Sequence, residues 1–92
     1  MNNIPQIETV MSNMTKLIMD GITIYYSYET PIAYVYKGHQ HIRKNDWSTT
    51  TGKHLNWVNE DKSLRVDGTV FELDLKDILD VLYGMGDNNV NL

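Results

Sequence analysis

One stretch of the chain, residues 46–59 with the sequence DWSTTTGKHLNWVN, constrains the fold more than any other. It holds both tryptophans, three consecutive threonines, a glycine, a lysine and a histidine. Serine and threonine hydroxyls accept the N–H groups that a first helical turn leaves without partners. The stretch therefore predicts the end of a strand followed by a short helix over residues 50–59, capped by Ser48, Thr49 or Thr50.

The start of this helix has two interpretations. Helix N-termini attract anions, and a lysine follows the threonines, so the turn is a candidate anion or partner site. The fragment TTTGK lacks the first glycine of a phosphate-binding loop, G-x-x-x-x-G-K, which argues against a nucleoside triphosphatase. The alternative is a capped helix whose tryptophans pack in the core. The candidate binding residues are Ser48, Thr50, Thr51, Lys53, His54 and Asn56.

Length and composition predict one small globular domain. The chain has 92 residues, of which 41% are hydrophobic, and this suffices for a single modest core. Because cysteine is absent, the chain offers no disulfide, no thiol nucleophile and no cysteine ligand for zinc. No apolar run has the length of a membrane span, and the first residues do not resemble a signal peptide. These features predict a cytoplasmic protein without a membrane segment.

The net charge of −4 is unevenly distributed. Residues 1–58 carry five Lys/Arg and four Asp/Glu, a balance of +1, whereas residues 59–92 carry three and eight, a balance of −5. A DNA-coating protein would have a basic footprint. The acidic C-terminal third instead suits a face that docks on a basic groove of a partner, although a solvated helix face has the same pattern. The candidate acidic residues are Asp74, Asp77 and Asp80.

The N-terminal third leaves two alternatives. Apolar residues at helical spacing predict a short helix over residues 4–13, or an N-terminal extension made of the first thirteen residues. Beyond it, the helix could continue as far as Asp20. Alternatively, residues 16–19 form a strand that turns at Asp20 and Gly21 into a second strand over residues 22–27. We favour this hairpin, because Asp-Gly between apolar residues is a strong turn signal.

The remainder of the chain predicts an α+β fold. Four further strands are expected, over residues 32–36, 39–43, 64–66 and 69–73. Asp67 and Gly68 would form the turn between the last two. Asp74 would cap a final helix that ends at Gly84, and residues 85–92 should fray. The expected architecture is a small antiparallel sheet of about four or five strands, with two or three short helices packed on one face.

Two segments of the chain, YSYETPIAYV and WSTTTGKHLNWV, form a distinctive pair. The residues that define it are Tyr26, Ser27, Tyr28, Thr30, Pro31, Ile32 and Ala33, then Trp47, Ser48, Thr50, Thr51, His54 and Asn56. The pair resembles a family of small proteins encoded by bacteriophages and mobile elements. That resemblance implies a viral or mobile-element setting rather than an activity. We expect Thr50 to cap the helix and His54 or Asn56 to hydrogen-bond the YSYETP turn, which would join the two segments into one structural unit.

The histidines favour neither metal binding nor catalysis. His39 and His41 would lie on the same side of a strand, but no carboxylate stands at a recognised metal spacing. His54, Asn56 and Ser48 do not form a nucleophile–base pair, because residues i and i+2 of a helix do not face each other. We therefore expect no enzymatic activity, no metal and no cofactor.

A tyrosine-rich sheet face is the candidate surface for single-stranded nucleic acid. Aromatic side chains next to basic groups stack against bases. Tyrosine is equally common in protein interfaces, so a protein partner or a homodimer fits the same surface. The residues concerned are Tyr25, Tyr28, Tyr34, Tyr36, Arg43 and Lys44.

The expected function is that of a non-enzymatic bacteriophage accessory protein. Small size, the resemblance and the uneven charge favour a protein that binds and inhibits a host macromolecule in the host cytoplasm. Its target would be a host protein or nucleoprotein complex of a defence system, such as a CRISPR effector. One alternative is a nucleic-acid-binding module that uses the tyrosine-rich face. Another is a protein that sequesters a nucleotide at residues 48–53.

Overall fold

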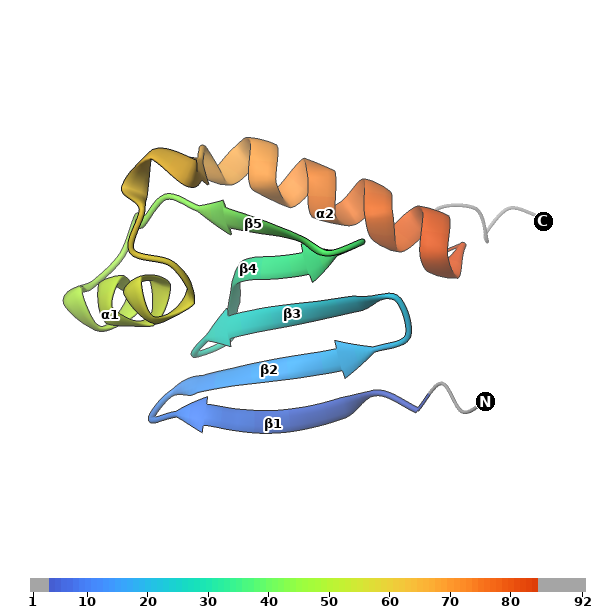
Figure 1. Ribbon diagram of the computed structural model, residues 1–92, viewed down its shortest axis with the longest axis horizontal. Coiled ribbons are helices and arrows are strands. Elements are labelled where there is room, and N and C mark those ends of the chain that lie inside the picture. The colour runs from blue at the N-terminus through green and yellow to red at the C-terminus, as the bar shows by residue number, and fades with distance from the viewer. Residues whose placement is uncertain (1–3, 85–92) are drawn as a thin grey trace.

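The computed structural model describes residues 4–84 and shows an α+β fold built on one six-stranded sheet (Figure 1). The strands follow one another across the sheet in chain order. They are β1 Gln6–Met11, β2 Met14–Met19, β3 Ile22–Ser27, β4 Thr30–Tyr36, β5 His39–Arg43 and β6 Arg65–Val66. The helices are α1 Thr49–Val58 and α2 Gly68–Tyr83, with a short 3-10 helix at Lys62–Leu64. The predicted fraying of residues 85–92 lies outside the described residues.

The sheet has more strands than the four or five expected, and the additional pairing lies at its ends. Strands β1 to β5 form an antiparallel meander, whereas β5 and β6 are parallel. The helix predicted over residues 4–13 is wrong, because this segment is β1. Its Ile7 pairs with Leu17 and its Glu8 with Lys16. A cross-strand partner thus outweighs the helical spacing of the apolar residues.

The hairpin favoured for the next segment is confirmed. Strand β2 turns at Asp20 and Gly21 into β3, and Gly21 has a φ of 95°, a conformation that glycine adopts at little cost. At the opposite end of the same strands, Asn13 and Tyr28 have φ values of 61° and 56° in the β1–β2 and β3–β4 turns. The backbone N–H of Tyr28 donates to the carbonyl of Asn13 at 2.8 Å, so these two turns are joined.

The second hairpin, predicted around Asp67 and Gly68, is wrong. Asp67 is the N-cap of α2, and its carboxylate accepts a hydrogen bond from the backbone N–H of Thr69 at 2.9 Å. Asp74 consequently lies inside the helix and does not cap it. An Asp-Gly pair suits a hairpin turn and a helix start equally well. The decisive feature is the spacing of Phe71 and Leu75, which places both on the buried side of one helix.

Each face of the sheet has its own core, because successive residues of a strand point to opposite faces. One core contains α2, and we call that side of the sheet the α2 face. Its buried residues are Ile22, Ile24, Tyr34, Phe71 and Leu75. The other core contains α1 and lies on the α1 face. Its buried residues are Met14, Ile32, Ala33, Ile42 and Leu55.

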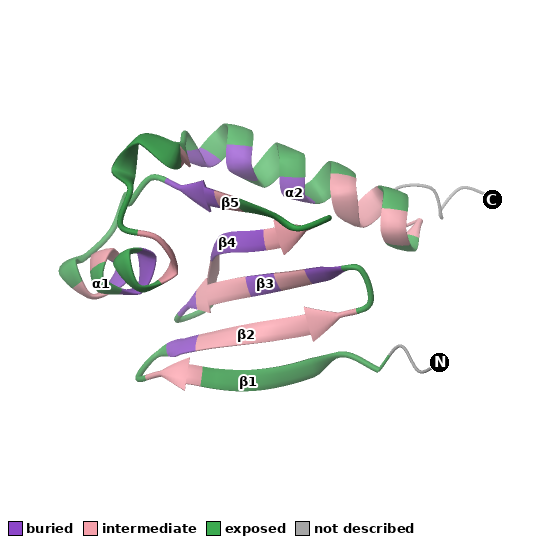
Figure 2. Cartoon of the chain, viewed as in Figure 1, coloured by how far each residue is buried: buried purple, intermediate pink, exposed green. Residues whose placement is uncertain are grey.

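The two helices therefore cover opposite faces of the sheet. Ile24 and Tyr34 are cross-strand partners in the α2 core, whereas the neighbouring pair, Tyr25 and Ala33, packs on the α1 side. The prediction that the helices share one face is wrong, since a sheet with apolar residues on both faces needs a cover on each. Strand β1 lies at the far edge, and four of its six residues are exposed (Figure 2).

Arg43 connects β5 to α2 and to the loop before α1. Its guanidinium donates to Glu72 at 2.7 Å, lies 3.4 Å from the carboxylate of Asp46, and stacks with Cζ 4.5 Å from the ring centroid of Trp47. Only 6% of its side chain is exposed, so Arg43 is a packed residue rather than the exposed binding residue expected from the sequence. A Cβ at Gly68 would overlap the guanidinium and stand 2.8 Å from its Cζ, so glycine is required for this contact.

Gly68→Ala should lower the free energy of unfolding by about 1–3 kcal/mol, because the added methyl group displaces Arg43. Gly52→Ala is the matched control in α1. Its nearest neighbour would be the flexible side-chain amide of Asn45 at 3.2 Å, and alanine favours a helix over glycine. Chemical denaturation of both variants measures the difference. Equal unfolding free energies would contradict the role assigned to Gly68.

Candidate functional site

The two motif segments meet in a buried cluster centred on His54. The Nδ1 atom of His54 lies 2.7 Å from Oγ of Ser27, and its Nε2 atom lies 3.1 Å from the carbonyl oxygen of Ser12. The hydroxyls of Ser27 and Thr51 are 3.0 Å apart. Ser27, Thr51 and His54 are all buried. The prediction that the segments form one structural unit through His54 is confirmed.

The direction of each hydrogen bond follows from the one group that can only accept. A carbonyl has no proton, so Nε2 of His54 donates to Ser12, and with a neutral ring Nδ1 accepts from Ser27. The Ser27 oxygen then accepts from the hydroxyl of Thr51. That hydroxyl accepts from Ser48 at 3.5 Å, and Oγ of Ser48 accepts from the backbone N–H of Thr51 at 3.2 Å. Every hydroxyl in the cluster therefore has both a donor and an acceptor role.

Ser48, rather than Thr50, caps α1. The helix begins at Thr49, one residue before the predicted start. Asn56 does not reach the YSYETP turn, because its side-chain oxygen accepts a hydrogen bond from Arg65 at 2.9 Å. Ser48, Thr49 and Thr50 all carry hydroxyls that can serve as a cap, so the sequence alone does not distinguish among them.

The six residues proposed for an anion or partner site do not line one open site. Thr51 and His54 are buried, and Ser48 is used as the cap. Lys53 and Asn56 remain exposed on α1. Thr50 is partly buried, and the hydroxyls of Ser48 and Thr51 and the ring of His54 are used in hydrogen bonds that join segments of the fold.

The four tyrosines of the predicted stacking surface do not share one face. Tyr34 is 1% exposed in the α2 core, and Tyr36 packs against the same core. Tyr25 packs on the α1 side, and Tyr28 lies in the β3–β4 turn. Lys44 is exposed after the end of β5. A continuous platform of all four tyrosines is thus not formed.

Both tryptophans are half-exposed, contrary to the alternative in which they pack in the core. Trp47 is 50% exposed and Trp57 is 51% exposed. The ring of Trp57 lies 5.9 Å from that of Tyr25 on the α1 side, centroid to centroid. Tyr25 is partly buried, so Trp57 is the exposed member of this pair.

The three acidic residues of α2 are placed differently from one another. Asp74 and Asp77 are exposed, whereas Asp80 is partly buried and accepts a hydrogen bond from Lys76 at 3.1 Å. Burial raises the pKa of the Tyr34 phenol, and the negative charge of Asp74 raises this pKa further. Burial also raises the pKa of Tyr26.

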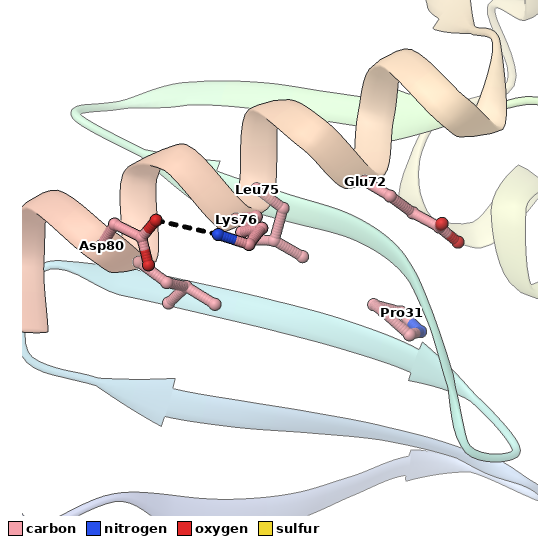
Figure 3. A pocket seen from close by; sticks show the side chains of 6 residues that line it. Pro31, Glu72, Leu75, Lys76 and Asp80 are labelled. Atoms are coloured by element: carbon pink, nitrogen blue, oxygen red, sulfur yellow. Dashed lines mark hydrogen bonds and ion pairs between the residues drawn. The ribbon is translucent and has the colours of Figure 1, made fainter. Parts of the chain in front are cut away.

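A groove beside α2 was not anticipated from the sequence (Figure 3). This α2 groove has a volume of about 430 Å³ and is lined by Pro31, Glu72, Leu75, Lys76, Leu79 and Asp80. A second hollow of about 330 Å³ includes Ile7, Leu17 and Tyr26 in its lining. One lining residue of each hollow is a neighbour of the other, since Tyr26 and Pro31 are cross-strand partners.

A metal cluster and a membrane-spanning helix each set requirements for the described part of the chain. Within residues 4–84, no group of three or more His, Asp or Glu side chains is arranged to hold a metal ion. Neither helix in this range is both long enough and apolar enough to cross a membrane.

A family model matches residues 2–72, which include the complete sheet, α1 and both motif segments. This chain belongs to DUF8033, a family of unknown function. The DUF8033 match ends inside α2, so Leu75 and Leu79 of the groove lie beyond it. No curated protein matches the chain, and neither does any solved structure.

Ser27→Ala should lower the free energy of unfolding by about 1–3 kcal/mol, because it leaves Nδ1 of His54 buried without a donor. Thr50→Ala is the control. Its hydroxyl is outside the cluster, so the change should stay within about 0.5 kcal/mol. Urea unfolding of the two variants provides the comparison. Equal losses would show that the cluster does not stabilise the fold.

Stability should fall at alkaline pH through Tyr34. The folded state holds the phenol proton more tightly than the unfolded chain does, so this contribution is complete below the unfolded pKa of about 10 and is lost as the pH rises through the higher folded pKa. Asp74→Asn should lower the pKa of Tyr34, whereas Asp77→Asn should leave it unchanged. NMR of the tyrosine Cζ carbons would follow the titration. The same shift in both variants would contradict the assignment.

Proposed function

We propose that this DUF8033 protein is a non-enzymatic binding protein that attaches to a protein partner through the α2 groove. In the bacteriophage or mobile-element setting suggested by the motif pair, the partner is part of a host defence system, such as a CRISPR effector, in the host cytoplasm. Binding then inhibits that partner. The observation that carries the proposal is an apolar groove whose neighbouring charges are already paired.

The chemistry of the α2 groove favours an apolar segment of a protein. Pro31, Leu75 and Leu79 supply its apolar lining. The charges at its rim are compensated within the chain, because Lys76 pairs with Asp80 and Glu72 pairs with Arg43. A polyanion would find few unpaired cations here, whereas an apolar side chain would displace water from the lining.

The width of the sheet favours a helix as the bound segment. Strands lie about 4.8 Å apart and a helix is about 10 Å wide, so one helix covers two or three strands. The buried strand residues of the α2 core come from β3 and β4, Met19 at the end of β2 packs against this core, and α2 also contacts β5. Strands β1 and β2 lie beside this cover on the same face. An amphipathic partner helix alongside α2 would fill the groove and cover these strands.

One observation favours a nucleic-acid partner as the second candidate. Trp57 is half-exposed beside Tyr25, and Lys53 lies one helical turn away on α1. An exposed aromatic pair near a lysine can stack bases of a single strand. The burial of Arg43 and Tyr34 removes two residues from this surface, so the protein partner remains the better supported proposal.

Recovery of partners from a host lysate, with and without nuclease, tests the proposal. The tagged chain should retain a protein partner after nuclease treatment. Leu79→Lys should weaken that recovery by about tenfold or more, equivalent to about 1.4 kcal/mol of binding free energy. Leu73→Lys is the matched control, because Leu73 is exposed on α2 but does not line the groove.

Thermal melting checks that both lysine variants fold. Lys76→Glu, at the exposed rim, provides a second groove variant that should disturb the fold less. Recovery that disappears with nuclease would favour the nucleic-acid candidate. Recovery that is equal for the wild type, Leu79→Lys and Lys76→Glu would exclude the groove as the binding site.

A further inference from the structure

The two edges of the sheet differ in the backbone that they present. At one edge, β6 is only two residues long and lies between the 3-10 helix and α2. At the other edge, β1 is six residues long and, within residues 4–84, pairs only with β2. The outward N–H and C=O groups of β1 thus have no strand partner in the described chain. Such an edge is a template for another strand.

Strand β1 has few of the features that usually block an edge. Pro5 lies before the strand and not inside it, and Glu8 is its only charged residue. The carboxylate of Glu8 lies 3.7 Å from Nζ of Lys16 on β2, so this charge is partly compensated within its own sheet. The irregularity in the β1–β2 pairing falls between Thr9 and Met11, which leaves the first four residues of β1 regular.

Most side chains of β1 are also not packed against the rest of the described chain. The first four residues are exposed (Figure 2), and Ile7 is 75% exposed on the α2 face, where it lines the second hollow. A partner at this edge would cover Ile7 and satisfy the backbone groups at the same time. An added strand provides both the burial of Ile7 and the backbone hydrogen bonds, whereas a partner that packs only on the face of the sheet provides no backbone hydrogen bonds.

We propose that the occupant is a second copy of this chain, with the two β1 strands antiparallel across a two-fold axis at Ile7. This register places Ile7 opposite Ile7 of the second copy. It also places Gln6 opposite Glu8 of the second copy, twice by symmetry, so that each side-chain amide can donate to a carboxylate.

Neighbouring registers are less favourable. An axis at Glu8 would oppose two carboxylates, and an axis at Thr9 would carry the pairing into the irregular part of the strand. With the axis at Ile7, the second hollows of the two copies meet across the axis. The pairing thus joins the two sheets through Gln6, Ile7 and Glu8 of each copy, and none of these residues lines the α2 groove.

Cysteine cross-linking tests the register directly, because the chain contains no cysteine. Residues opposed in an antiparallel pair have Cα atoms about 4.5–5.5 Å apart, within the range of a disulfide. Under mild oxidation, Ile7→Cys should form a covalent dimer several-fold faster than either control. One control is Gln6→Cys, because in this register residue 6 lies two positions away from residue 6 of the second copy. The other control is Leu73→Cys, which is exposed on α2.

Sedimentation of the uncrosslinked chain supplies the second measurement. The wild type and Leu73→Lys should show a concentration-dependent dimer, and Ile7→Lys should lose it because two ammonium groups would face each other. A wild-type monomer across the concentration range would overturn the proposal. So would a dimer that survives Ile7→Lys, or equal cross-linking of Ile7→Cys and Leu73→Cys. The groove variants at Leu79 and Lys76 lie outside β1, so either proposal can fail without the other.

Discussion

The hydrogen bonds around His54 hold together three segments that are distant in the sequence. The β1–β2 turn contributes the carbonyl of Ser12, the last residue of β3 contributes the hydroxyl of Ser27, and α1 contributes Thr51 and His54. A buried polar group without a partner is costly, so the cluster is stable only when all three segments are in place. It attaches α1 to the end of the sheet where the two turns meet (Figure 1).

This attachment separates the polar chemistry of the chain from its open apolar surface. The hydroxyls and the histidine of the motif pair satisfy one another on the α1 side, and Arg43 is similarly enclosed between Glu72 and Trp47. The α2 groove lies on the opposite face and is lined mainly by aliphatic groups. The polar and charged residues that the sequence offered as binding candidates, such as His54, Thr51 and Arg43, therefore stabilise the fold. The proposed binding surface is instead apolar.

Local signals were sufficient for a large part of the fold. The Asp20 and Gly21 hairpin, strands β3 to β5, helix α1 and the apolar stripe of α2 all follow from patterns within a few residues. The contact between His54 and the first motif segment, at Ser27, was also predictable, because the paired motifs suggested that two segments meet. These features depend on residues that are close in the sequence, or on a motif pair that includes both of the segments in contact.

The remaining features depend on partners that no local pattern reveals. Strand β1 has helical apolar spacing and becomes a strand only because β2 is beside it. Asp67 and Gly68 suit a turn or a helix cap, and the packing of Phe71 decides between them. The burial of Arg43 requires the approach of Gly68, twenty-five residues away. The groove exists only once α2 has been positioned over the sheet.

The most direct test of this account is the state of the His54 ring in solution. Nitrogen-15 NMR of the histidine side chains distinguishes the two tautomers and measures how fast each ring N–H exchanges with water. The account predicts that His54 carries its proton on Nε2, that this proton exchanges slowly, and that the Ser27 hydroxyl correlates with Nδ1. A proton on Nδ1, or exchange as fast as that of the exposed His39, would contradict the claim that buried hydrogen bonds of His54 connect α1 to the sheet.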